Sequence, residues 1–237
     1  EGKVGGMNVY VRQLAAHLAA NGIKVDVFTR THLATDQEEP EQGPVRVRHI
    51  EGIPQDEPLL DLYSFWPHFL DQVHRVSIKE KVHYTMVHSH YWLSGQIGYN
   101  LSISWNVPNL ITFHTLAKLK DEALQNRNEP PLRVLVESEL MSKANGIVAF
   151  SQHEKDAMVR LYGASEDKIR IAPSGVDLTL FHPLENSALT LIKPKEQIIL
   201  FVGRLEPLKG VDLLIRAISV MKRSNPVKAF IIGGDQQ

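Results

Sequence analysis

The chain alternates short runs of apolar, often β-branched residues with longer segments in which apolar residues return every three or four positions. The first pattern is typical of buried strands and the second of amphipathic helices. In the segment 7–22 the apolar residues share one helical face, and Gly22 follows as a stop signal. Strands that alternate with helices and are apolar on both faces predict a parallel, doubly wound α/β sheet. The segments with the strand pattern are 24–30, 45–50, 84–89, 109–114, 146–151, 168–173, 197–203 and 228–234.

The periodicity lapses in one stretch of the chain, where Pro183 and Pro194 stand in a polar setting. A new strand, turn and helix follow it. We therefore predict an N-terminal domain at 1–182, a linker at 183–196 and the start of a second domain of the same kind at 197–237. Two strands and a helix cannot cover both faces of a sheet, so the second domain is expected to be truncated.

Paired glycines, Gly5 and Gly6, stand directly before the first predicted helix. Without side chains, the backbone N–H groups there can approach a phosphate, and the helix N-terminus adds a favourable partial positive charge. The alternative is a plain tight turn. In a doubly wound fold such a loop follows a strand, so we expect the first strand of the domain to precede Glu1 and the chain to be a fragment.

Composition narrows the class of protein. The 237 residues are 43% hydrophobic and 22% charged, which is an ordinary globular balance. The formal net charge of −1 argues against a nucleic-acid partner or an anionic membrane surface. The chain has no cysteine, which excludes a disulfide framework and a thiolate metal site. Without an apolar stretch of bilayer-spanning length, we expect a cytoplasmic protein with no transmembrane segment.

Two predicted strands end in a histidine beside a hydroxyl residue: His90 with Tyr91, and His114 with Thr115. Ligands bind α/β sheets at the carboxyl ends of the strands, so these residues are expected to converge on one crevice. His88 and His90 could instead bind a metal, but no third ligand stands near them in the sequence. A polar substrate site is therefore favoured, and no metal is expected.

The segment FVGRLEPLKG places Arg204 just after a predicted strand and Lys209 just before a helix. The guanidinium of Arg204, which can bind two oxygens at once, and the compact ammonium of Lys209 would face the same region, and together they suit a diphosphate. The alternative is two solvated surface cations. The chain has no G-x-S-x-G elbow for a serine hydrolase, and no G-x-G-x-x-G fingerprint for an NAD-dependent oxidoreductase.

Together these motifs resemble the retaining glycosyltransferases of family 4. GGMNVYVRQLAAHLAANGIKVDVFTR, VHSHYWLSGQIG, TFHTLAKLK, RIAPSGVDLTLFHP and FVGRLEPLKG stand in the family's order and spacing, over essentially the whole chain. Within the family, GGMNVYV with HSHYWLSG looks closest to inositol-phosphate glycosyltransferases, and sucrose-phosphate synthase-like enzymes are near relatives. The resemblance implies a GT-B fold, which has two Rossmann-like doubly wound domains.

The resemblance implies donor and catalytic roles for five residues. Arg204 and Lys209 match the pair that holds the donor diphosphate and stabilises charge on the leaving nucleotide. Gly5 and Gly6 match the donor-side loop, in which the amide of Gly6 faces phosphate. His114 matches the position beside the transferred sugar. The expected catalytic residues are therefore His114, Arg204 and Lys209.

On the acceptor side, the resemblance implies binding roles for Asn8, Tyr91, Thr115 and Arg133. In one respect the chain departs from the inositol-phosphate pattern, in which a lysine after the EG pair helps to hold the acceptor phosphate. Gln55 stands at that position here, which puts the acceptor in question.

The expected function is retaining transfer of a hexosyl group from a nucleoside-diphosphate sugar, with UDP as the expected nucleotide, to an acceptor hydroxyl. The acceptor would be a small molecule, with a phosphorylated polyol or sugar as one option. No cofactor is expected, and a homodimer is left open. The alternative function is a non-catalytic module that binds sugar nucleotides.

Overall fold

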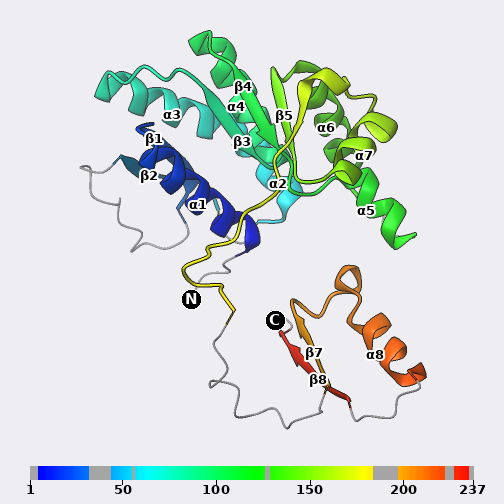
Figure 1. Ribbon diagram of the computed structural model, residues 1–237. Helices are drawn as coiled ribbons and strands as arrows, with labels where there is room; N and C mark the ends of the chain where they lie inside the picture. Colours follow the sequence, from blue (N-terminus) through cyan, green and yellow to red (C-terminus); the bar gives the residue numbers. More distant parts are fainter. Residues whose placement is uncertain are drawn as a thin grey trace. The chain divides into compact units, whose positions relative to one another are not determined.

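Figure 1 shows the computed structural model, which describes residues 5–31, 44–54, 57–125, 129–183, 197–221 and 227–234. Strands and helices alternate along the described chain, as the sequence pattern predicts. In chain order the elements are α1 (Gly6–Ala20), β1 (Val25–Arg30), β2 (Val45–Ile50), α2 (Leu59–Leu62), η1 (Tyr63–Phe65), α3 (Trp66–Glu80), β3 (Val87–His90), α4 (Trp92–Trp105), β4 (Asn109–Thr112), α5 (Ala117–Leu124), α6 (Pro131–Lys143), β5 (Gly146–Ala149), α7 (Gln152–Tyr162), η2 (Glu166–Lys168), β6 (Ile169–Ile171), β7 (Gln197–Val202), η3 (Pro207–Lys209), α8 (Val211–Val220) and β8 (Val227–Ile232).

Every strand pair among the described residues is parallel, which confirms the predicted sheet type. The strands form a pair β1-β2, a sheet in the order β3-β4-β5-β6, and a pair β7-β8. Contacts divide the chain into a larger unit, Glu1–Asp121 with Arg127–Ser174, and a smaller unit, Glu122–Asn126 with Gly175–Gln237. The division that we drew from the sequence at 183–196 falls mostly outside the described residues and stays a prediction.

The main core of the larger unit lies between the four-stranded sheet and helices α4, α6 and α7. Ile111 and Phe113 from the β4 segment are fully buried there, together with Leu140 of α6 and Met158 of α7. Trp92, the first residue of α4, is 2% exposed and stacks on Tyr63 with ring centroids 5.5 Å apart. Trp92 is therefore part of the core.

A second cluster joins the β1-β2 pair to α3, α4 and β3 through Ile50, Val73 and Leu101. Beside it lies a network of charged groups in which Arg46 donates to Asp26 and Glu80. The hydroxyl of Tyr84 donates to Asp26, and Arg48 donates to Glu80. Charged groups taken out of water need such partners, so this network fixes α3 against the β1-β2 pair.

Helix α4 approaches β3 and β4 closely because two of its residues are glycines. A Cβ added to Gly98 would lie 1.8 Å from Oγ of Ser89 and 3.1 Å from Cγ1 of Val87. One added to Gly95 would lie 2.6 Å from Cδ1 of Ile111. Gly98 therefore sets the distance between the helix and β3, the strand that ends at His90, and Gly95 sets the distance between the helix and β4.

Five strands, β4 to β8, end one or two residues earlier than the sequence pattern suggested, and two of them show why. We predicted a strand at 109–114, but β4 ends at Thr112 because His114 takes a positive φ of 62°. We predicted another at 146–151, but β5 ends at Ala149. Ser151 caps α7 instead, because its side chain accepts a hydrogen bond from the backbone N–H of Glu154.

The smaller unit contains β7, η3, α8 and β8. Its two strands pair in register from Gln197 with Val227 to Val202 with Ile232. Apolar side chains of this unit remain open to solvent, including Phe230 at 42% and Ile232 at 57%. This exposure agrees with the expectation that two strands and a helix do not cover both faces of a sheet. None of the described helices is both long and apolar enough to cross a bilayer.

We expect Gly98→Ala to destabilise the larger unit. A helical Gly→Ala change gains about 1 kcal/mol of helix propensity, but overpacking a core costs about 1–3 kcal/mol. Ser89 is only 4% exposed, so its hydroxyl has little room to move away from the new methyl group. Urea unfolding measures the difference. Ser104→Ala, at an exposed position of the same helix, is the matched control and should change the stability little. Unchanged or higher stability of Gly98→Ala would show that α4 does not need glycine at this contact.

Candidate functional site

The carboxyl ends of β3 and β4 bring the predicted histidines together. The two strands pair in parallel register, with His90 opposite Thr112. Nδ1 of His90 lies 3.1 Å from Nε2 of His114, and Nε2 of His88 lies 2.9 Å from Oγ1 of Thr112. The rings of His88 and His90 lie 4.3 Å apart between centroids, as their spacing of two along a strand predicts. The expected convergence of the two strand ends is therefore present.

The backbone at both strand ends is held in a rare conformation. Tyr91 has φ 79° and His114 has φ 62°, a region that residues with a side chain seldom occupy. The N–H of Tyr91 donates to the carbonyl of Thr112 at 2.9 Å, and the carbonyl of Tyr91 accepts from Gly95 at 2.9 Å. Such strained residues persist only where the surroundings hold them, and they cluster at functional sites.

The histidines are neutral at physiological pH. Burial lowers the pKa of His114 to about 4 and that of His88 to about 4. Burial, together with the neighbouring His88 and His114, lowers the pKa of His90 to about 3. The contact between His90 and His114 therefore joins two neutral rings, of which one donates and the other accepts. His114 can offer a neutral polar group, but not a positive charge, to a ligand.

Helix α1 closes one side of this cluster through Tyr10. Its ring makes edge-on contacts with His90, His114 and Phe150, at centroid distances of 5.9, 5.3 and 5.0 Å. The sequence analysis missed Tyr10, although it stands within the glycine-rich motif one helical turn after Gly6. Its contacts place the first turns of α1 beside the carboxyl ends of β3, β4 and β5.

No described side chain caps the N-terminus of α1. Gly5 is the N-cap residue with φ −88°, and the first turn has no acidic residue. A Cβ added to Gly5 or Gly6 would meet nothing within 4 Å among the described residues. Neither backbone strain nor packing against the described residues therefore calls for glycine here. Asn8 is exposed in the same turn.

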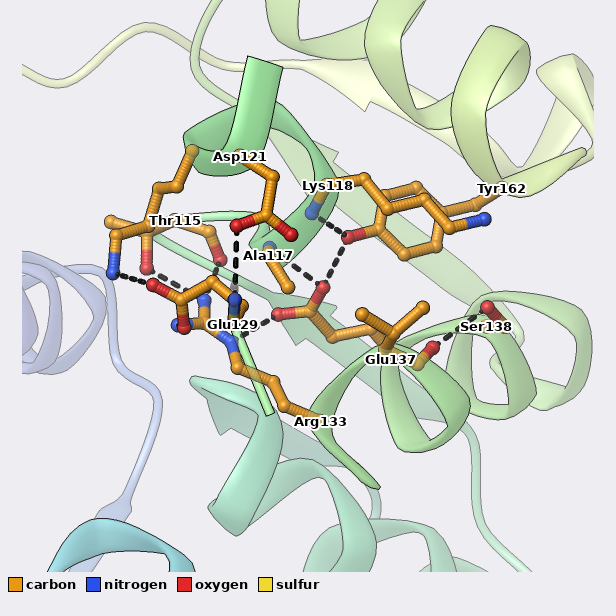
Figure 2. A network of polar contacts seen from close by, with 11 residues as sticks. Thr115, Ala117, Lys118, Asp121, Glu129, Arg133, Glu137, Ser138 and Tyr162 are labelled. Carbon is orange, nitrogen blue, oxygen red and sulfur yellow. Dashed lines mark hydrogen bonds and ion pairs between the residues drawn. The ribbon is translucent and has the colours of Figure 1, made fainter. Parts of the chain in front are cut away.

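Arg133 is the centre of a buried polar network (Figure 2). Its side chain is 3% exposed, and its Nε donates to Oε1 of Glu137 at 2.7 Å. Nη2 donates to the carbonyl oxygen of Thr115 at 2.9 Å and to its Oγ1 at 3.0 Å. Nη1 donates to Oε2 of Glu129 at 2.9 Å. The guanidinium carbon lies 5.0 Å from the ring centroid of Tyr91, so three predicted acceptor residues meet here.

Two lysines that follow Thr115 are engaged elsewhere. Nζ of Lys118 donates to the carbonyl of Leu161 at 2.6 Å and lies over the ring of Tyr162. Nζ of Lys120 lies 2.5 Å from Oε1 of Glu129. Glu129 therefore bridges Lys120 and Arg133. This bridge could not be predicted from the sequence, because the two cations belong to different helices.

Arg204 and Lys209 lie in the smaller unit. Arg204 follows β7 directly and its Nη1 lies 2.6 Å from Oε1 of Glu206. Lys209 is exposed and ends the 3₁₀ helix η3, after which Gly210, with φ 68°, leads into α8. The predicted strand, turn and helix around these cations is confirmed, while their role stays a prediction.

Two further expectations concern a metal site and Gln55. The described residues hold no group of three or more His, Cys, Asp or Glu residues that could bind a metal ion. Gln55, the proposed departure in the acceptor site, lies outside the residues that the structure describes.

Comparison with known proteins agrees with this arrangement. Residues 4–180 match the family described as Glycosyltransferase Family 4, and residues 185–237 match that described as Glycosyl transferases group 1. The D-inositol 3-phosphate glycosyltransferase of Kineococcus radiotolerans is 38% identical over 98% of this chain and 57% of its own length. That of Saccharomonospora viridis is 41% identical over 94% of this chain and 53% of its own length. The chain thus spans a little over half of these relatives.

Solved structures show the same fold. Sucrose-phosphate synthase from Thermosynechococcus elongatus superposes with a TM-score of 0.82 at 30% identity, over 98% of this chain and 58% of that one. The Anabaena protein HepE, in complex with UDP-glucose, gives a TM-score of 0.67 at 17% identity over 99% of this chain and 58% of that one, a likeness of fold alone. These matches confirm the α/β, GT-B fold class. The chain belongs to Glycosyltransferase Family 4.

Proposed function

We propose that the chain is part of a retaining glycosyltransferase that transfers a hexosyl group from a nucleoside-diphosphate sugar to a hydroxyl of a small-molecule acceptor. One observation carries this proposal. A helix N-terminus that no described side chain caps, neutral histidines and a buried arginine converge at the carboxyl ends of the parallel strands of the larger unit. That combination suits a ligand with both an anionic part and several hydroxyl groups.

On the donor side, the amide of Gly6 would face a phosphate, and Arg204 with Lys209 would bind the diphosphate. Both cations lie in an exposed turn beside the start of α8, where a ligand can reach them. Their charge would stabilise the negative charge that develops on the leaving nucleotide. His114 would lie beside the transferred sugar as a neutral hydrogen-bonding group. UDP is the nucleotide we expect, from the family resemblance.

Transfer would proceed on one face of the sugar. The bond from the anomeric carbon to the diphosphate oxygen breaks, and a bond to the acceptor oxygen forms on the same face. The acceptor proton passes to the departing phosphate oxygen. Glu129 and Glu137, the carboxylates of the network around Thr115, form ion pairs with Arg133, which makes them poor nucleophiles for a double displacement. Positioning and charge stabilisation then supply the catalysis.

On the acceptor side, Thr115, Tyr91 and Arg133 would receive an anionic group, with Asn8 contacting the acceptor from α1. The described contacts of Arg133 use four of its five N–H groups, and the fifth is on Nη1. The relatives named D-inositol 3-phosphate glycosyltransferase support a phosphorylated polyol or sugar as the acceptor.

A donor screen on the full-length protein tests the proposed function. Release of free nucleotide from UDP-, ADP- and GDP-sugars is followed with and without candidate acceptors. We expect acceptor-dependent release from one nucleotide class. Tight binding of a sugar nucleotide without turnover by any acceptor would favour a non-catalytic binding module instead.

Replacement of either donor-side cation should lower turnover strongly. We predict that Arg204→Ala and Lys209→Ala each reduce kcat by roughly two powers of ten or more, as removal of a charge-stabilising group does. Arg216→Ala, which removes an exposed cation of α8, is the matched control and should retain activity. Activity of the Arg204 or Lys209 variant near that of the control would contradict the assignment.

Gln55 should weaken the binding of a phosphorylated acceptor. A charge-assisted hydrogen bond contributes about 1.5–3 kcal/mol, so inositol 3-phosphate should bind roughly tenfold to a hundredfold more tightly to the Gln55→Lys variant. The KM for the acceptor measures this effect. Ser104→Lys adds the same charge at the far end of α4 and should leave KM unchanged. A low KM for inositol 3-phosphate in the unaltered protein would show that Gln55 does not limit the site.

The buried histidines should make folding sensitive to acid. In the unfolded chain the histidines bind protons below about pH 6.5, whereas His88 and His114 in the folded chain bind them only near pH 4. The stability of the fold should therefore decrease as the pH falls from about 6.5 to about 4. One pKa unit corresponds to about 1.4 kcal/mol, and the expected loss is a few kcal/mol in total. Urea unfolding at pH 7 and pH 4.5 measures it.

His88→Gln should reduce this pH dependence, whereas His17→Gln, at an exposed position, should leave it as in the unaltered chain. Equal pH dependence in both variants would show that His88 is not held neutral by burial.

A further inference from the structure

The carboxylate of Glu137 connects three parts of the larger unit. The side chain lies in α6 and is 0% exposed. Its Oε1 accepts from Nε of Arg133, one helical turn earlier, at 2.7 Å. Its Oε2 accepts from the backbone N–H of Ala117, at the start of α5, at 2.9 Å, and from the hydroxyl of Tyr162, at the end of α7. Figure 2 shows these contacts meeting at one carboxylate.

These contacts determine how Arg133 is presented. Glu137 holds the Nε side of the guanidinium, Glu129 holds Nη1, and the carbonyl and hydroxyl of Thr115 hold Nη2. The guanidinium is planar, so hydrogen bonds to acceptors on several of its sides allow it only one orientation. A longer or shorter side chain at 137 would turn the plane away from Thr115.

The same carboxylate also fixes the loop between β4 and α5. This loop carries His114, with its positive φ, and Thr115. The loop ends where α5 begins, at Ala117. The backbone N–H of Ala117 donates to Glu137, and that of Lys118 donates to the hydroxyl of Tyr162 at 2.9 Å. Burial and the neighbouring Glu137 raise the pKa of Tyr162 above its ordinary value, so the hydroxyl keeps its proton and donates it.

We propose that Glu137, assisted by Tyr162, is a positioning residue that sets Arg133 and Thr115 in the arrangement that binds the anionic group of the acceptor. The proposal rests on the function proposed above. Glu137 has no exposed surface, so it acts through Arg133 and the loop and touches no substrate. Its contacts join helix α6, which carries Arg133, to the end of the loop that carries Thr115.

The test compares Glu137→Gln and Tyr162→Phe in the full-length protein. Both variants keep the side-chain size, so each removes charge or a hydrogen bond without opening a cavity. Glu80→Gln is the matched control, because Glu80 is also a carboxylate held by arginines, Arg46 and Arg48, in the same unit but away from the site. The measurements are KM for acceptor and for donor, hydrolysis of the donor by water, and melting temperature.

We expect Glu137→Gln to raise the acceptor KM about tenfold or more, because a misplacement near 1 Å costs up to about a hundredfold. Donor KM and donor hydrolysis should stay within about twofold. Tyr162→Phe should shift the acceptor KM in the same direction by less. Glu80→Gln should lower the melting temperature and leave the acceptor KM unchanged. An unchanged acceptor KM in Glu137→Gln, or equal rises in the KM for acceptor and donor, would overturn the proposal. If Glu137→Gln does not fold, Tyr162→Phe decides by the same criterion.

Calorimetric titration with inositol 3-phosphate and with inorganic phosphate separates this proposal from the function on which it rests. If no sugar nucleotide supports transfer, the proposed function fails, but weaker binding of these anions to the variants than to the unaltered protein still supports positioning. An unaltered protein that binds neither anion would overturn the positioning role as well.

Discussion

The parallel pairing of β3 with β4 is the constraint on which the candidate site depends. Parallel strands bring their carboxyl ends to the same edge, and the register that sets His90 opposite Thr112 brings the two following loops together. Tyr91, one residue after β3, and His114, two residues after β4, then adopt positive φ. The backbone therefore turns away from the sheet soon after each strand ends. Glycines in α4 let that helix lie close behind β3 and β4. The histidine cluster and the Arg133 network both follow from this pairing.

Two kinds of polar group share this edge of the sheet, and burial by itself favours the neutral form of both. The histidines lose their charge, so His90 and His114 form a neutral hydrogen-bonding pair suited to sugar hydroxyls. Arg133 keeps its charge because Glu129 and Glu137 compensate it. Neutral and charged groups therefore lie in the same part of the larger unit, which suits the ligand that we propose.

Much of the fold and part of the site could be predicted from the sequence. Apolar periodicity located the eight strands that the described residues form, and their parallel arrangement followed from alternation with helices. The convergence of His90 and His114 followed from a general rule for strand ends. The contact of Tyr10 with both histidines and the role of Glu137 could not be predicted, because they depend on how distant helices pack on the sheet. Strand ends were missed by a few residues where His114 and Ser151 leave the ladder for a strained turn and a helix cap.

We propose transfer with retention at the anomeric carbon, by a site that supplies charge and position but no nucleophile. The most direct measurement is proton NMR of the product formed by the full-length protein from a sugar nucleotide of known anomeric configuration. The coupling constant of the anomeric proton reports the configuration of the new linkage. We predict that the product keeps the configuration of the donor. A product of inverted configuration would contradict the account.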